Sequence, residues 1–179
     1  MIFPLKKQII SINNTENGFL NSYDNHAEIP LLPHPGAFAK VRKNHCHEGV
    51  DLYCNDGDEV YSMLEGKVLA IIKFTGEHAG SEWWNNTWSV LVEHKDFVIN
   101  YGEIIPSNNL YEGMLVTEGF CLGKVTTVLK KDKGRPRNML HLEMYELGTK
   151  QHLNSWDLNM QKPQNLLDPT SLLLKYLTN

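Results

Sequence analysis

The stretch His47-Glu48-Gly49-Val50-Asp51 is the most informative part of this 179-residue chain, because it places an imidazole and a carboxylate four positions apart. That spacing puts His47 and Asp51 on one face of either regular element: about one turn of a helix, or an even number of steps along a strand. A catalytic zinc site uses three protein ligands and leaves its fourth position to water. His141, in Met139-Leu140-His141-Leu142-Glu143, is the best candidate for the third ligand. By residue type alone, two surface histidines and a surface acid remain an alternative.

The segments around His47 and His141 resemble the lysostaphin/LytM-type zinc metallopeptidases, which cut peptide bonds in bacterial peptidoglycan. The first motif of that family is His-x-Gly-x-Asp, then Gly-x-x-Val, then Asp-Gly-x-Val. It is matched in order by His47-Glu48-Gly49-Val50-Asp51, Gly57-Asp58-Glu59-Val60 and Glu65-Gly66-Lys67-Val68. The second motif, His-Leu-His-Phe-Glu, corresponds to residues 139–143, so the resemblance spans roughly residues 36–174. It implies one zinc ion per chain, bound by His47, Asp51 and His141.

The family likeness has two departures at positions where its members carry auxiliary catalytic histidines. The first histidine of the second motif is Met139 here, and the Tyr-x-His-Leu stretch reads Tyr101-Gly102-Glu103-Ile104. Glu103 has three interpretations: a solvated strand carboxylate, a general base for a water at the zinc, or a carboxylate that orients a ligand imidazole. Glu143 competes for that orienting role because it shares a strand face with His141. His45 is either an ordinary loop histidine or a replacement auxiliary group.

The apolar pattern predicts a mostly β protein, and the resemblance implies an antiparallel β sandwich or half-open barrel with the duplicated hybrid motif fold. Strands are expected over residues 59–63, 67–74, 88–94, 97–101, 123–129 and 139–145, with a short one between Gly113 and Gly119. The first two should form one hairpin, and the next two a second hairpin around the two-residue turn Lys95-Asp96. Alternation over 139–145 places Met139, His141 and Glu143 on one face.

The ends of the chain and two loops complete the expected organisation. Residues 1–35 should be an irregular arm with at most one short strand, and residues 36–179 a single domain. Asp168-Pro169 predicts a short helix over 170–176. Loops 75–86 and 130–138 carry the tryptophans and a run of basic residues, and in the family such loops wall a substrate groove. The expected groove residues are Trp83, Trp84 and Tyr101, although the tryptophan pair could equally be a structural cap.

Composition limits the possible partners and compartment. A net charge of −4 argues against general binding of nucleic acid, and no apolar run approaches the ~18 residues of a membrane span. The first residues show no secretory signal peptide. Three cysteines at scattered spacing predict free thiols rather than a disulfide framework. We therefore expect cytoplasmic synthesis in a reducing compartment, which for a wall-cutting enzyme fits a phage-encoded protein or one released or delivered to the wall.

Two functions follow from these observations. The first is a zinc-dependent metallopeptidase that hydrolyses peptidoglycan peptides, and it is favoured by the three ligands and by the acid at position 103. The second is a catalytically degenerate member that keeps the fold and the metal but acts as a structural or wall-binding module. The two missing auxiliary histidines favour this alternative.

Overall fold

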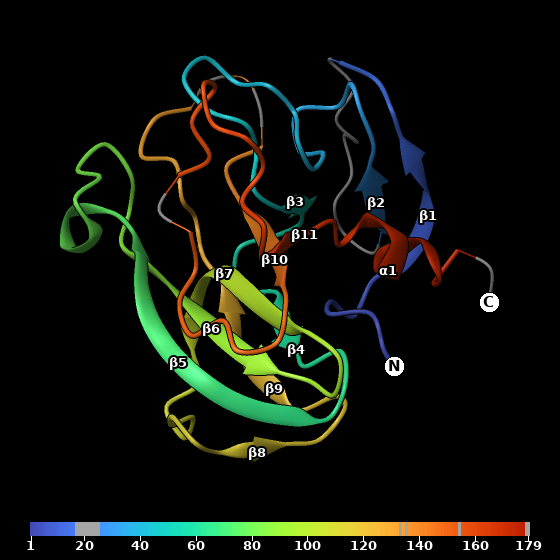
Figure 1. Ribbon diagram of the computed structural model, residues 1–179, viewed down its shortest axis with the longest axis vertical. Coiled ribbons are helices and arrows are strands. Elements are labelled where there is room, and N and C mark those ends of the chain that lie inside the picture. Colours follow the sequence, from blue (N-terminus) through green and yellow to red (C-terminus); the bar gives the residue numbers. More distant parts are fainter. Residues whose placement is uncertain (17–25, 133, 135, 154, 178–179) are drawn as a thin grey trace.

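The computed structural model describes residues 1–16, 26–132, 134, 136–153 and 155–177 of the chain. Its centre is a nine-stranded sheet in which every pairing is antiparallel, and a separate two-stranded sheet lies beside it (Figure 1). The sheet does not close into a barrel among the described residues. The prediction of a mostly β protein is confirmed. No helix in the described part is long and apolar enough to cross a membrane.

The elements are joined by short turns and by longer connections, the longest of which precede β3 and β11. The strands are β1 Gln8–Asn13, β2 His26–Pro30, β3 Val50–Tyr53, β4 Glu59–Tyr61, β5 Gly66–Thr75, β6 Thr87–Glu93, β7 Val98–Pro106, β8 Leu115–Val116, β9 Cys121–Val125, β10 Met139–Tyr145 and β11 Leu166–Leu167. The helices are a 3₁₀ turn, η1 Glu77–Ala79, and α1 Thr170–Leu174. The large sheet runs β11-β10-β7-β6-β5-β8; β3 also pairs with β10, and β9 pairs with both β4 and β7.

Local strand pairing was predicted better than distant pairing. β6 and β7 form the expected hairpin, with Glu93 opposite Val98 and a two-residue turn closed by a hydrogen bond from His94 N to Phe97 O of 2.9 Å. The hairpin predicted from residues 59–63 and 67–74 is wrong. β4 pairs with β9, whereas β5 pairs with β6 and β8. The chain turns after β4 as predicted, but it carries the next strand to a different part of the sheet.

Other boundaries differ from the prediction for identifiable reasons. The strand predicted at 123–129 is β9, which begins earlier, at Cys121, and ends at Val125, where its partner β7 reaches the bulge at Glu103. Helix α1 is shorter than predicted, and Asp168 Oδ1 accepts a hydrogen bond from Thr170 N at its start. The arm contains two strands rather than at most one, since β1 and β2 pair in parallel. Residues 17–25 of the arm lie outside the described residues.

The two faces of the sheet have different environments. On one face, side chains of β3, β6, β7 and β10 enter the main core. Side chains of β2 and α1, which lie on the right in Figure 1, help to cover this core. On the opposite face, Leu91, Val98 and Tyr145 pack with Trp156 and Leu166 in a smaller cluster. Because strand side chains alternate, every second residue of β10 that precedes Tyr145 faces this smaller cluster. His141 therefore faces that side, and Asp51, which stands opposite His141, faces it as well.

Candidate metal centre

Strands β3 and β10 bring the two motifs together by pairing Asp51 with His141 in register. His47 lies before β3, so the four-residue spacing does not reflect a shared helix or strand. Gly49 allows the chain to bend against β10: a Cβ at this position would lie 2.3 Å from Leu142 O and 2.9 Å from His141 Nε2. Close packing against β10 therefore requires glycine at this position. The close approach brings the side chain of His47 next to that of Asp51.

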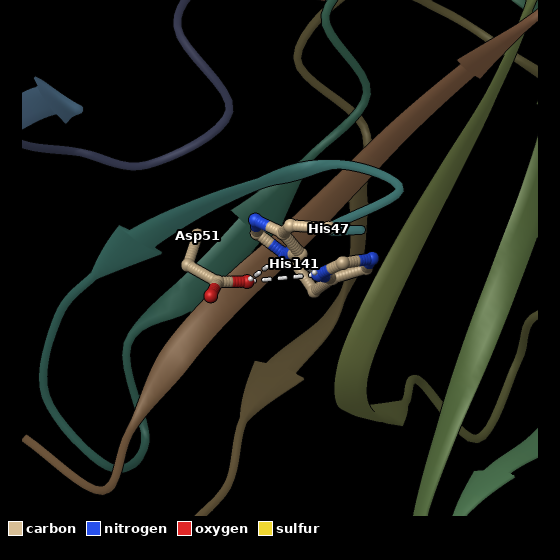
Figure 2. Close-up of side chains that lie close together, drawn as sticks. All are labelled: His47, Asp51 and His141. Atoms are coloured by element: carbon tan, nitrogen blue, oxygen red, sulfur yellow. Dashed lines mark hydrogen bonds and ion pairs between the residues drawn. The ribbon is translucent and has the colours of Figure 1, made fainter. Parts of the chain in front are cut away.

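The three predicted ligands converge on one point. His141 Nδ1 lies 2.8 Å and His47 Nε2 lies 3.0 Å from Asp51 Oδ1, and the two nitrogens are 3.2 Å apart (Figure 2). With zinc bonds of about 2.0–2.1 Å, tetrahedral geometry places ligand atoms about 3.3 Å apart. All three side chains are buried. The donor types and their spacing fit a zinc ion that keeps an open coordination position.

Hydrogen bonds on the far side of each imidazole fix the tautomers. His47 Nδ1 is 2.9 Å from the carbonyl oxygen of Ala37, which can only accept, so Nδ1 carries the hydrogen and Nε2 presents a lone pair. His141 Nε2 faces Glu143 Oε1 at 3.2 Å, which leaves His141 Nδ1 to face Asp51. Two imidazole lone pairs and a carboxylate oxygen therefore point at one another. Such an arrangement requires a cation between them, either a proton or a metal.

A second layer of side chains holds the ligands in place, as is typical of metal sites. Glu143 Oε2 accepts hydrogen bonds from Asn100 Nδ2 at 2.7 Å and from Tyr145 Oη at 2.8 Å. Arg42 Nη2 donates to Asp51 Oδ2 at 2.7 Å and to the carbonyl of Pro35 at 3.0 Å. Glu143 was expected in this position. Arg42, Asn100 and Tyr145 were not, although the register Asn100–Glu143 would have revealed one of them once β7 was paired with β10.

The charges around the three ligands favour a bound cation. Burial opposes ionisation of Asp51, but the neighbouring His47, Arg42 and His141 hold the pKa of its carboxyl well below the usual range. Burial also opposes protonation of His141, yet Asp51 and Glu143 raise its pKa well above that of a free histidine. The pKa of His47 is lowered, chiefly by burial. Without metal, a proton on His141 supplies the positive charge that the two carboxylates require.

Glu103 occupies an unusual place in β7. Opposite Ser89 stands Gly102 and opposite Trp88 stands Ile104, so Glu103 is the extra residue of a β-bulge, with φ of 66°. Left-handed backbone is uncommon for residues other than glycine and is often associated with functional sites. The side chain is 9% exposed, and Oε2 has no hydrogen-bond partner among the described residues. Burial, with the charge of Asp51, raises the pKa of Glu103 to about 8.

Glu103 is therefore not a solvated surface carboxylate. It is not one of the three residues whose ligand atoms lie within 4.8 Å of one another. Met139, which stands where the family has a histidine, is buried on the same face of β10 as His141. His45 forms a backbone bridge with Asp157, and no hydrogen bond or ion pair joins its side chain to the described ligands.

The expected groove residues lie in different environments. Trp83 is 66% exposed, while Trp84 forms a backbone bridge with Leu129. Tyr101 is fully buried and its hydroxyl accepts a hydrogen bond from Met63 N, so it offers no surface to a substrate in this structure. Lys133 and Arg135 of the basic loop lie outside the described residues.

The two loops that were expected to wall a groove are joined to each other. Asn85 N bonds Val128 O at 2.8 Å, and Lys130 Nζ bonds the carbonyl of Glu82 at 2.6 Å. Loop 75–86 and the segment after β9 thus form one continuous wall. This wall reaches Glu103 through the bond from Thr126 N to Glu103 O.

Solved structures with a similar fold include a peptidase domain. The catalytic domain of the antimicrobial peptidase lysostaphin from Staphylococcus simulans matches with a TM-score of 0.52 at 17% identity, covering 77% of this chain and 88% of that one. LytU matches with a TM-score of 0.52 at 15% identity, covering 78% and 81%. The chain spans only 37% and 26% of two longer proteins, from Pseudomonas aeruginosa and Vibrio cholerae, with TM-scores of 0.42 and 0.41.

No protein-family model and no curated protein matches the sequence. At the identities above, the structural matches establish the fold and leave the reaction open. The chain has the fold of the lysostaphin/LytM-type peptidases.

Proposed function

We propose that this protein is a zinc-dependent metallopeptidase that hydrolyses peptides of bacterial peptidoglycan. The observation that carries the proposal is the convergence of His47 Nε2, Asp51 Oδ1 and His141 Nδ1 at 2.8–3.2 Å, with the other ring nitrogen of each histidine already bonded. The fold shared with the lysostaphin catalytic domain supports the reaction class. His47, Asp51 and His141 would hold the metal, and two neutral imidazoles with one carboxylate leave it a net charge of about +1.

A zinc ion held there would supply Lewis acidity, polarising a scissile carbonyl and acidifying a water molecule. Glu103 supplies the proton acceptor: its carboxylate takes the proton of the attacking water and returns it to the leaving amine. Glu103 Oε2 has no hydrogen-bond partner among the described residues, so this oxygen is available for that bond. Met139 has no exchangeable proton and takes no part in this transfer.

The substrate in this proposal is an extended peptide lying along the wall formed by loop 75–86 and the segment after β9. Trp83 is the exposed aromatic side chain of that wall. Three free cysteines fit synthesis in a reducing compartment, from which lysis or a delivery partner would bring the protein to the cell wall. A phage-encoded protein would be made in the reducing cytoplasm and would reach the cell wall at lysis.

The decisive experiment measures new amino groups released from purified peptidoglycan. Protein reconstituted with zinc should release them, whereas the same protein treated with chelator should not. His141→Ala removes a metal ligand and should match the chelated sample. Restoring zinc to the chelated wild type should restore release, which separates loss of metal from irreversible unfolding.

The second candidate function is a wall-binding module without hydrolysis, and it is favoured by Met139 and by the lack of a histidine at position 103. If this candidate function is right, zinc-loaded protein should sediment with insoluble peptidoglycan and should release no amines from any wall preparation. Wall binding without amine release would decide for the module.

A further inference from the structure

Three buried polar atoms behind His141 have no hydrogen-bond partner among the described residues: Ser89 Oγ, Asn100 Oδ1 and His152 Nδ1. Ser89 and Asn100 are fully buried. Removing a polar atom from water without a replacement bond is costly, and native proteins commonly place ordered water at such atoms. None of the three was identified from the sequence, and the proposed reaction uses none of them directly.

The register of the sheet places two of these residues beside the metal ligand. Ser89 stands opposite Gly102, which stands opposite His141, and Asn100 stands opposite Glu143. Directly opposed residues of antiparallel strands point to the same face. Ser89 and Asn100 therefore occupy diagonal positions on the face that carries His141 and Glu143.

Phe74 connects this face to His152. Its ring extends from β5 across β6 as far as β7, where a Cβ on Gly102 would lie 2.8 Å from it. The same ring lies 5.5 Å from the ring of His141 and 5.0 Å, edge-on, from the ring of His152. Because β6 lies between β5 and β7, the Phe74 ring lies on the face that carries Ser89, and His152 packs edge-on against this ring.

The segment that carries His152 is held against the same face. Leu153 N donates a hydrogen bond of 2.9 Å to Tyr145 Oη, which in turn donates to Glu143 Oε2. Burial lowers the pKa of His152, although the charge of Glu143 acts in the opposite direction. A neutral ring with its hydrogen on Nε2 leaves Nδ1 as an acceptor.

We propose that Ser89, Asn100 and His152 together hold one buried water molecule, and that through it His152 is a positioning residue for Glu143 and His141. The water accepts from Ser89 Oγ–H and donates to Asn100 Oδ1 and His152 Nδ1, which gives the usual three bonds of a buried water. Asn100 Nδ2 already donates to Glu143 Oε2 at 2.7 Å, so a fixed amide fixes the carboxylate that orients His141. The water site is independent of metal, whereas the positioning role rests on the proposed zinc centre.

The first test is a double-mutant cycle in metal-free protein, read by urea unfolding. Ser89→Ala removes the hydroxyl, and His152→Phe removes both ring nitrogens while keeping a ring against Phe74. Each should lower the folding equilibrium constant by about tenfold, the typical effect of one hydrogen bond. The double variant should be no worse than about the poorer single variant, because both lose the same water. Effects that simply multiply would overturn the shared water.

The second test reads the His152 tautomer from long-range proton–nitrogen correlations. The ring should carry its hydrogen on Nε2, with Nδ1 shifted as a hydrogen-bond acceptor, and Ser89→Ala should move the Nδ1 signal. His78 is the matched control, since its ring packs edge-on against Trp88 at 4.7 Å and its Nε2 lies 2.9 Å from Thr87 O. Its signals should not move. A hydrogen on His152 Nδ1 would exclude the proposed water bond.

The third test measures zinc release to a chromogenic chelator. Ser89→Ala and His152→Phe should each speed release by about tenfold, within the range for outer partners of metal ligands. His78→Phe should release zinc at the wild-type rate. Unchanged release in all variants would overturn the positioning role. If wild type binds no zinc, the proposed function fails, but the first two tests still decide whether the water site exists.

Discussion

His141 faces Asp51 across the β3–β10 pair, with 2.8 Å between His141 Nδ1 and Asp51 Oδ1, although 90 positions separate them in the chain. This contact depends on strand register. A slip of one residue between β3 and β10 would send one of the two side chains to the opposite face of the sheet. The candidate metal site and the pairing of these strands are therefore formed together, and the first prediction follows from this.

We expect about one zinc ion per chain, bound by His47, Asp51 and His141. His141→Ala should weaken zinc binding by more than about 100-fold, because it removes a ligand and not merely an outer partner. Elemental analysis and chelator competition would measure both quantities. His78→Ala, a change at a histidine in another loop, is the control. Full zinc occupancy in the His141 variant would mean that the ligand set is wrong.

Zinc affinity should fall as the pH is lowered. Although burial acts against it, the carboxylates of Asp51 and Glu143 raise the pKa of His141, so zinc has to displace a proton from this ring. Calorimetric titrations in two buffers with different ionisation heats should reveal net proton release on binding. Affinity independent of pH between about 5.5 and 8 would contradict a histidine ligand that has to lose a proton when zinc binds.

Glu103→Gln keeps the size and hydrogen bonding of the side chain but removes the proton acceptor. It should cut hydrolysis by at least about 100-fold and leave zinc binding unchanged. Amine release and chelator competition on the same preparations would separate the two effects. Glu146→Gln, a change at an exposed glutamate outside the proposed substrate wall, serves as the matched control. Hydrolysis at the wild-type rate in Glu103→Gln would show that another group accepts the proton.

Glu103 should make the metal-free protein less stable as the pH rises from about 4.5 toward 8. The lowered pKa values of His47, His94 and His152 act in the opposite direction below about pH 6.5, so the effect of Glu103 is read by comparing variants. Burial raises the pKa of Glu103 to about 8, so the folded state keeps a proton that the unfolded chain releases near pH 4.5. Because Glu103 holds this proton in the folded state, its contribution to the free energy of unfolding decreases with pH in this window. The raised pKa of His141 acts in the same direction above about pH 6.5. Urea unfolding should show a shallower slope in Glu103→Gln than in Glu146→Gln.

Gly49→Ala should damage the metal site by displacing the chain and not by removing a ligand. The new Cβ would lie 2.3 Å from Leu142 O, which forces the segment of His47 away from β10. We expect a loss of about 1–3 kcal/mol in unfolding free energy, as in other overpacked sites, together with weakened zinc binding. Gly80→Ala is the control for zinc binding: nothing lies within 4 Å of its Cβ, although its left-handed φ of 78° lowers stability by itself. Its zinc affinity should be that of the wild type.

The residues that sequence reasoning found share a local signature. His47, Asp51 and His141 stand in short motifs with fixed spacing, and the β6–β7 hairpin needs only a two-residue turn between alternating strands. The pairing of β4 with β9 could not be read in the same way. Its partners are far apart in the chain, and nothing in either segment specifies the other.

The support around the ligands escaped sequence reasoning for the same reason. Arg42 and Asn100 reach the site from separate elements, and each is an unremarkable polar residue until the strands are placed. His152 belongs to a long connection between β10 and β11, whose position against the sheet depends on Leu153 and Trp156 packing there. Tyr101 was expected in the groove, but its side chain lies in the main core. The bulge at Glu103 separates the environments of the two residues.

The bulge at Glu103 has a consequence for how this site can diverge. Its backbone is already left-handed, with φ of 66°, and histidine, asparagine and aspartate tolerate that conformation better than most residues do. The bulge fixes where the side chain at position 103 points without depending on what that side chain is. Replacement there exchanges one functional group for another inside an unchanged frame. A histidine-based and a carboxylate-based site could thus be interconverted in a single substitution, with the sheet, the three ligands and their outer partners left as they are.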